Sequence, residues 1–240
     1  MFLSTLNMHK FIKFQETVNT VIIPIGTFEA HGPHCPLGTD FIIPNKLVEN
    51  INNELDDKIF VAPTVNYGSS WGLGVFPGTV NISNETMACY IEEIGNGFLT
   101  WGIDNIVLLN GHGGNGPALR IAAQHMADHG ANVLVVNWWS DYMSDILEIC
   151  ESRGHAGEDE TSVMLAITPE FVDMQYAPTN KNETIGKIYT ADLAYKSMEN
   201  AITGDATKAS AEKGQKILAV VTKNIIDLLQ SFMIGKFFKE

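Results

Sequence analysis

Residues 20–40 read TVIIPIGTFEAHGPHCPLGTD, a short apolar run followed by a loop rich in glycine, proline, histidine and acidic residues. The run from Val21 to Ile25 is apolar at every position, which indicates a strand buried on both faces of a parallel sheet. Similar runs predict three more strands: Phe60 to Val65, Ile106 to Leu109 and Val133 to Val136. The polar loop therefore begins where a buried strand ends.

Helical stretches fall between these strands and after the last of them. Asn115 is a good N-cap for one of them, and Pro117 suits its first turn. The helices are expected over about 40–54, 84–101, 115–130, 157–168 and 205–232. This β-α-β-α order predicts an α/β fold, with a mainly parallel sheet covered by helices on both faces, in a single domain over residues 1–240.

Composition excludes several classes of partner. The chain has 240 residues and a formal net charge of −13, so it repels nucleic acid and anionic membrane surfaces. No apolar run approaches the roughly 20 residues that cross a bilayer. The three cysteines are widely spaced, with no C-x-x-C pair, which is typical of a reducing compartment. We therefore expect a cytoplasmic protein with no nucleic-acid or membrane partner.

Chemically active residues follow each strand. In open parallel sheets, ligands bind beyond the carboxyl ends of the strands. After the first strand, Glu29 and His31 are two residues apart, so an extended segment points both side chains the same way. With Asp40 they form an oxygen and nitrogen set that zinc, manganese or iron prefers. Asp40 can bridge two metals. Taken alone, Asp40 is better interpreted as a helix N-cap and His31 as an ordinary loop histidine.

The next two strands run into NYGSS at 66–70 and NGHGGN at 110–115. Glycines around His112 permit close approach of the backbone to a ligand, and no Gly-Lys-Ser/Thr follows to indicate a phosphate loop. His112 is therefore a candidate metal ligand. The candidate substrate-binding residues at these strand ends are Ser70, Trp71, Gly113 and Asn115, although a tryptophan serves equally well in core packing.

A third polar segment, HAGEDETS, covers residues 155–162. His155 precedes the expected helix and is a candidate proton donor to a leaving nitrogen, with Glu158 as a second catalytic candidate. Acidic residues in a first helical turn also occur simply because they favour the helix dipole, and Asp159 fits that alternative. The pair His125 and His129 lies in the last turns of a helix and is expected to have a surface role.

Together these motifs resemble the creatininase (creatinine amidohydrolase) family. The resemblance rests on PIGTFEAHGPHCPLGTD at 24–40, FPGT at 76–79, NGHGGN at 110–115, HAGEDETS at 155–162 and GDATKASAEKG at 204–214. It implies a three-layer α/β/α fold, a small-molecule amide substrate, and a homo-oligomer, often a hexamer. It also implies two divalent metal ions, one held by Glu29, Asp40 and His112 and the other by His31 and the bridging Asp40. Glu160 is a candidate further ligand or base.

The sequence departs from creatininase proper at three places. Gly114 stands where that enzyme has a glutamate ligand, Glu151 where it has a tryptophan, and Trp71-Gly72 where many relatives have Glu-His. The expected chemistry is hydrolysis of an amide C–N bond by a metal-activated hydroxide, with creatinine itself not implied. Alternatives within the family are a formylaminopyrimidine-nucleotide deformylase and a precursor-peptide peptidase. An alternative of another class is a metal-binding scaffold without catalysis.

Overall fold

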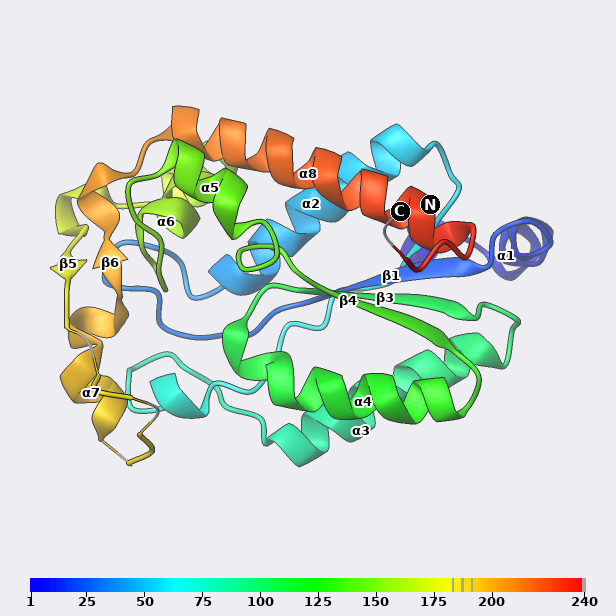
Figure 1. The fold of residues 1–240 in the computed structure, drawn as a ribbon, viewed down its shortest axis with the longest axis horizontal. Coiled ribbons are helices and arrows are strands. Elements are labelled where there is room, and N and C mark those ends of the chain that lie inside the picture. Colours follow the sequence, from blue (N-terminus) through cyan, green and yellow to red (C-terminus); the bar gives the residue numbers. More distant parts are fainter. Residues whose placement is uncertain (183, 187, 191, 239–240) are drawn as a thin grey trace.

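The computed structural model describes residues 1–182, 184–186, 188–190 and 192–238. Its centre is a parallel sheet of four strands between two layers of helices (Figure 1). The strand order is β2 (Phe60–Val61), β1 (Thr20–Ile25), β3 (Asn105–Asn110) and β4 (Asn132–Asn137). The register pairs Ile25 with Asn110 and Asn110 with Asn137, so three strands end level with one another. The expected α/β class and three-layer architecture are confirmed.

Alternate side chains of each strand enter opposite cores. Ile22 and Val107 pack on one face of the sheet, whereas Ile23 and Leu108 pack on the other. The first face is covered by α2 (Thr39–Leu55), α5 (Met143–Ile149), α6 (Glu158–Ile167) and α8 (Ala211–Met233). The second face is covered by α1 (Met8–Gln15), α3 (Asn84–Leu99) and α4 (Gly116–Asp128). Because both faces are buried, the strands carry continuous apolar runs.

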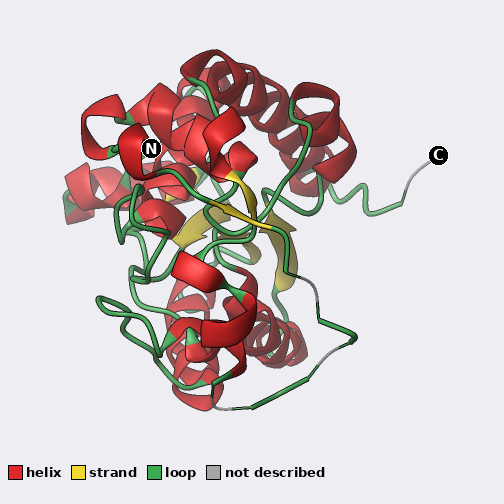
Figure 2. Ribbon diagram, turned by 90° about the vertical axis from the view of Figure 1, so that its left-hand side faces the viewer, coloured by secondary structure: helices red, strands yellow, loops and turns green. Residues whose placement is uncertain are grey.

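A small second layer of structure lies beyond the carboxyl ends of the strands. An antiparallel pair, β5 (Thr179–Asn180) and β6 (Gly204–Asp205), lies there with α7 (Leu193–Ser197), as Figure 1 shows. Figure 2 looks at this end of the molecule, where long loops and short helices cover the strand ends. The end of the sheet that carries the polar loops is therefore enclosed.

Two glycines bring the start of α2 against the strand ends. A Cβ at Gly26, after β1, or at Gly111, after β3, would overlap the backbone carbonyl of Asp40. Only glycine permits so close an approach of these segments. Asp40 is thereby held between the ends of the two central strands, in the first turn of α2.

The second strand is shorter than predicted. It ends at Val61 rather than Val65, because Pro63 cannot donate to the ladder and Pro24 of β1 has no N–H to offer in return. The chain rejoins the sheet at Val65, whose N–H donates to the carbonyl of Pro24 at 3.0 Å. The gap leaves residues 62–64 outside the regular strand.

The last helix also differs from the prediction. It begins at Ala211 and not at Asp205, because Asp205 pairs in β6 and its carboxylate accepts a hydrogen bond from the N–H of Thr207. The N-cap of α8 is Ser210, whose side chain accepts from the N–H of Lys213. In the described part of the chain three short helices, α1, α5 and α7, are additional to the predicted set. No helix in the described part of the chain is long and apolar enough to cross a membrane.

Candidate metal centre

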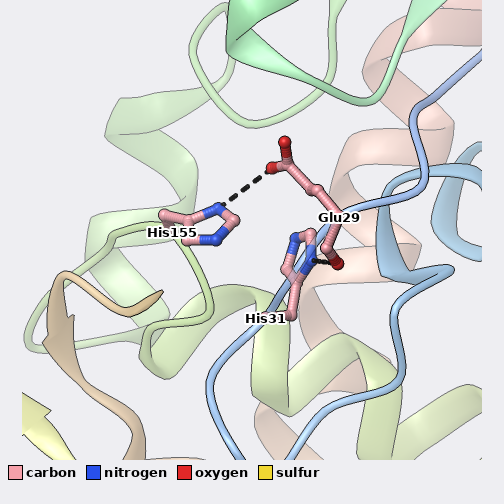
Figure 3. Close-up of side chains that lie close together, drawn as sticks. All are labelled: Glu29, His31 and His155. Carbon is pink, nitrogen blue, oxygen red and sulfur yellow. Dashed lines mark hydrogen bonds and ion pairs between the residues drawn. The ribbon is translucent and has the colours of Figure 1, made fainter. Parts of the chain in front are cut away.

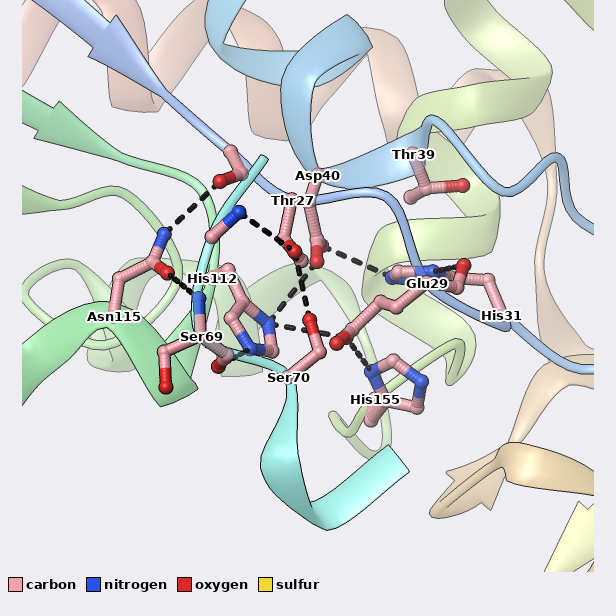
Figure 4. Close-up of polar contacts among 12 residues, drawn as sticks. Thr27, Glu29, His31, Thr39, Asp40, Ser69, Ser70, His112, Asn115 and His155 are labelled. Atoms are coloured by element: carbon pink, nitrogen blue, oxygen red, sulfur yellow. Dashed lines mark hydrogen bonds and ion pairs between the residues drawn. The ribbon is translucent and has the colours of Figure 1, made fainter. Parts of the chain in front are cut away.

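The five predicted metal ligands come together at the carboxyl ends of β1 and β3. Figure 4 shows Glu29, His31, Asp40 and His112 of this set. Glu29 and His31 lie in the loop after β1, Asp40 and Glu160 in the first turns of α2 and α6, and His112 after β3. Their donor atoms form two groups that share Asp40, and within each group all donors lie within 4.8 Å of one another. One group is Glu29, Asp40 and His112, and the other is His31, Asp40 and Glu160.

Distances within the two groups match those between ligands of one ion. His112 Nδ1 lies 3.0 Å from Glu29 Oε1 and 3.1 Å from Asp40 Oδ2. On the other side of Asp40, His31 Nε2 lies 3.0 Å from Oδ1 and 3.7 Å from Glu160 Oε2. Donors about 2 Å from a tetrahedral ion lie roughly 3.3 Å apart. Asp40 thus presents one oxygen to each group.

The ring nitrogens that face away from the carboxylates have fixed partners. His31 Nδ1 donates to the backbone carbonyl of Glu29 at 3.1 Å, and His112 Nε2 donates to that of Ser69 at 3.0 Å. A neutral imidazole carries one proton, so each ring then presents a lone pair to the carboxylates. A metal-ligating histidine characteristically has its other nitrogen held in this way. Both rings are oriented to bind a cation.

Several buried carboxylate oxygens have no hydrogen-bond donor. These are both oxygens of Glu29 and Oδ2 of Asp40, in side chains that are almost completely buried. The contacts of His112 to these oxygens are short but lack hydrogen-bond geometry. Burying unpaired carboxylates is strongly unfavourable unless a cation compensates them. The set of oxygen and nitrogen donors therefore fits a divalent ion such as zinc, manganese or iron.

The pKa values of the proposed ligands are shifted by burial and by the charges of the neighbouring ligands. Burial raises the pKa of Glu160 to about 8 and also raises that of Glu29. Burial would raise the pKa of Asp40 as well, but the rings of His31 and His112 hold it well below its usual range. Against burial, the nearby carboxylates raise the pKa of His31 to about 10 and that of His112 well above its ordinary value. The centre attracts positive charge, which a proton or a metal can supply.

His155 approaches the centre from the loop before α6 (Figure 3). Its Nε2 donates to the carbonyl of Ala30 at 2.8 Å, and its Nδ1 lies 3.6 Å from Glu29 Oε1. The ring is 4.2 Å from that of His31 between centroids. Burial, together with the neighbouring His31, lowers the pKa of His155 to about 3. His155 is thus a neutral ring whose free nitrogen faces the predicted metal site.

The acidic residues in the first turn of α6 have separate contacts. Glu160 Oε2 accepts from the N–H of Ala156 at 2.7 Å, beside the metal centre. Glu158, expected to be catalytic, has its carboxylate directed to the N–H of Ser152 at 2.9 Å and to Lys213 Nζ at 2.6 Å. The structure therefore places Glu158 in the support of the loop that carries His155, outside the cavity wall.

Asn115 and Gly114 support His112 from behind. Asn115 Oδ1 accepts from the N–H of Ser69 at 2.9 Å, while its Nδ2 donates to the carbonyl of Gly26 and to Asn110 Oδ1, each at 3.1 Å. The Asn115 side chain is thus buried in this network, whereas it was expected to bind substrate. A Cβ at Gly114 would overlap the carbonyl of Ser69 and the ring of His112, so a glutamate has no room there.

A cavity of about 1090 Å³ opens from the metal centre. Three of the residues expected to bind substrate line it, namely Ser70, Trp71 and Gly113. Ser70 Oγ is also hydrogen-bonded to Thr27 Oγ1 at 2.7 Å. Sequence reasoning missed how much of the wall comes from the segment after α6. The residues of this segment that line the cavity are Thr184, Gly186, Ile188, Tyr189, Thr190, Leu193, Ser197 and Met198.

Other histidines and tryptophans lie outside the centre. His125 and His129 contact Glu92 and Asn96 on the exposed surface of α3 and α4, as expected. His34 Nε2 is hydrogen-bonded to Thr161 Oγ1 at 2.8 Å behind the site. Trp138 belongs to the core, whereas Trp139 lines the cavity.

Known proteins resemble the chain over nearly its whole length. A family model described as creatinine amidohydrolase matches residues 4–229. The mycofactocin precursor peptide peptidase of Mycolicibacterium smegmatis is 33% identical over 223 residues, covering 89% of this chain and 85% of that protein. The creatinine amidohydrolase of Pseudomonas putida is 26% identical over 233 residues, covering 88% of each. A solved structure named Creatininase Mn superposes with a TM-score of 0.84 at 23% identity, covering 97% of this chain and 98% of that one. The last likeness concerns the fold alone.

Proposed function

The chain belongs to the creatininase family of hydrolases that act on C–N bonds, and we propose that it hydrolyses a substrate amide at a centre of two divalent metal ions. The observation that carries this proposal is the pair of donor groups sharing Asp40 at the floor of the cavity. Two ions bridged by one carboxylate are the usual arrangement in hydrolases that activate a shared water.

The proposed ligands divide between the two ions as their donor atoms do. Glu29, Asp40 and His112 would hold one ion, and His31, Asp40 and Glu160 the other. Divalent ions bound here would lower the pKa of water and polarise the carbonyl of the amide. We propose zinc, manganese or iron because the donors are carboxylate oxygens and imidazole nitrogens, with no thiolate among them. Glu160 serves in this scheme as a ligand and not as the base.

His155 is proposed to carry the proton to the leaving nitrogen. Its Nε2–H is engaged by the Ala30 carbonyl, so Nδ1 remains free beside Glu29 and toward the cavity. A neutral ring in that position can accept a proton as the carbonyl is attacked and return it to the departing amine. Positioned general acid–base catalysis of this kind contributes about 10²- to 10⁴-fold to rate.

We propose an extended substrate such as a peptide, in preference to a small cyclic amide. The cavity of about 1090 Å³ is slightly larger than the roughly 300–1,000 Å³ that holds drug-sized ligands. Trp71 and Tyr189 lie at its wall with ring centroids 6.2 Å apart, and they are 56% and 78% exposed. Two exposed aromatic rings can pack on an apolar part of a substrate. The relative from Mycolicibacterium smegmatis, named a precursor peptide peptidase, supports the same choice.

Two further properties belong to this proposal. We propose a homo-oligomer in solution because large apolar side chains outside the cavity wall are exposed, among them Val75 and Tyr195. Light scattering coupled to size-exclusion chromatography tests the oligomeric state, since the mass of a monomer would contradict the proposal.

We propose a cytoplasmic location because the three cysteines, Cys35, Cys89 and Cys150, are unpaired.

The proposed reaction can be tested with a panel of short peptides, formamides and cyclic amides that includes creatinine. Amine release is measured for metal-loaded protein, for chelator-treated protein and for the His155→Gln variant. His125→Gln is the matched control, since that ring lies on the surface of α4. The proposal predicts turnover of a peptide that chelation abolishes and His155→Gln greatly slows. Turnover unaffected by chelation would contradict it.

A further inference from the structure

One cationic side chain stands in an otherwise acidic cavity. Four carboxylates line the wall, from Glu29, Asp40, Asp159 and Glu160. Among the described residues of the wall, Arg153 is the only lysine or arginine. The chain as a whole carries a formal net charge of −13 and only two arginines. The guanidinium in the cavity wall is therefore not part of a generally basic surface. Its position calls for a specific role.

The backbone on both sides of Arg153 is firmly held. The N–H of Ser152 donates to Glu158, that of Gly154 donates to Asp159 Oδ1 at 3.0 Å, and that of His155 donates to Thr203 Oγ1 at 2.9 Å. Consecutive Cα atoms are about 3.8 Å apart, so the Cα of Arg153 lies within roughly 7.6 Å of the Cα of His155. The base of the side chain is therefore fixed near the residue proposed to transfer the proton.

The guanidinium has one electrostatic neighbour, because the positive charge of Arg153 acts to lower the pKa of Asp159. Arg153 is exposed, and no hydrogen bond or ion pair of its side chain is found in the described part of the chain. Glu151 pairs with Lys208, and Asp159 accepts from the N–H of Gly154 through Oδ1, so neither carboxylate forms a direct ion pair with Arg153. A planar guanidinium with free donors matches a carboxylate in two parallel hydrogen bonds.

We propose that Arg153 binds a carboxylate of the substrate, so that the enzyme selects amides bearing an anionic end group a few bonds from the scissile C–N bond. This inference rests on the proposed function and specifies its substrate class. A phosphate dianion offers the same hydrogen-bond acceptors, but it meets stronger repulsion from the four acidic side chains than a carboxylate monoanion does. The free carboxylate end of a peptide has the required chemistry.

Hydroxamates test the assignment, because their two oxygens chelate divalent metal ions and fix one end of the probe. Four are compared by calorimetry on zinc- or manganese-loaded protein: acetohydroxamate, the monohydroxamate of succinate, its carboxamide analogue, and the analogue ending in a phosphonate. Acetohydroxamate has no end group and gives the affinity of the metal centre alone. Three proteins are compared: wild type, Arg153→Gln and the matched control Arg120→Gln. Arg120 is the second arginine of the chain and lies on α4.

We expect the succinate probe to bind wild type and Arg120→Gln about 10- to 100-fold more tightly than the carboxamide, as charged hydrogen bonds do. That preference should fall to about twofold or less in Arg153→Gln. Equal affinities in wild type, or a preference that persists in Arg153→Gln, would overturn the carboxylate site while leaving the metal centre intact. Tighter binding of the phosphonate would overturn it in favour of a phosphate. Failure of acetohydroxamate to bind at all would contradict the metal centre and, with it, this inference.

Discussion

Replacing Gly114 with alanine should weaken both the fold and the metal centre. The added Cβ would lie well inside 3.0 Å of two atoms, the carbonyl oxygen of Ser69 and Nε2 of His112. One of these is backbone and the other is a ring held on both sides, so neither can yield without breaking the hydrogen bond between them, which is 3.0 Å long. The substitution therefore acts directly on the nitrogen that sets the orientation of His112.

The size of the effect follows from three contributions. Overpacking in a close-packed region costs about 1–3 kcal/mol, and loss of one hydrogen bond costs roughly 0.5–1.5 kcal/mol. Replacing a glycine stabilises the protein by about 0.4–1 kcal/mol, because it lowers the conformational entropy of the unfolded chain. The net destabilisation of Gly114→Ala should then be about 0.5–4 kcal/mol. At roughly 2–4 °C per kcal/mol for a chain of this size, the expected fall in Tm is about 1–16 °C, with a central value of about 7 °C.

Thermal unfolding of metal-free protein measures the stability, and competition with a fluorescent chelator measures the metal affinity. We expect the metal affinity of Gly114→Ala to be about 10- to 100-fold lower than that of wild type. Losses of this size are typical when a metal-ligating histidine loses the hydrogen-bond partner of its other ring nitrogen. Gly97→Ala is the matched control, because a Cβ there meets nothing within 4 Å and the residue lies inside the helix α3. Its Tm should be unchanged or slightly higher. A Gly114→Ala variant with wild-type Tm and wild-type metal affinity would refute this reasoning.

Three further predictions concern the centre and its support. His155→Gln should retain its metal and lower kcat by roughly 10²-fold or more with little change in KM, in steady-state kinetics alongside metal analysis. Asn115→Ala leaves three buried partners without their hydrogen bonds and should lower the free energy of unfolding by about 2–5 kcal/mol in urea titrations. Metal affinity should rise with pH between about 6 and 10. The pKa of Glu160 is raised to about 8 and that of His31 to about 10, so below these values protons compete with the ion. Calorimetry in buffers of different ionisation enthalpy should show protons released on binding, and a release of zero would contradict the ligand assignment.

The sheet and its polar end could be predicted from the sequence because both leave strong patterns. Continuous apolar runs such as Val21 to Ile25 are unusual outside buried strands, and the register of a parallel sheet then brings the residues after each strand to one edge. Residues as distant as Glu29 and His112 could therefore be placed together from the sequence. The place of Glu160 came from the resemblance, since an acidic first turn of a helix has an ordinary explanation in the dipole.

The structure differs from the expectation where tertiary contacts decide which groups a residue meets. Glu158 and Glu160 are both acidic residues in the first turn of α6, yet one meets Lys213 and the other His31, according to the side of the helix each occupies. Asn115 looks like a substrate ligand beside Gly113, but it turns inward to Ser69. No local pattern shows that Thr184, Ile188 and Leu193 line the cavity, because their placement depends on contacts distant in the sequence.

The most direct test of the two-metal proposal is metal content, measured by mass spectrometry on protein purified without added metal. Wild type is compared with Asp40→Asn, which removes the charge shared by the two donor groups, and with Asp128→Asn, an exposed aspartate of α4, as matched control. The proposal predicts about two equivalents of zinc, manganese or iron in wild type and the control, and loss of both in Asp40→Asn. Metal-free wild-type protein that also fails to bind added zinc or manganese would contradict it.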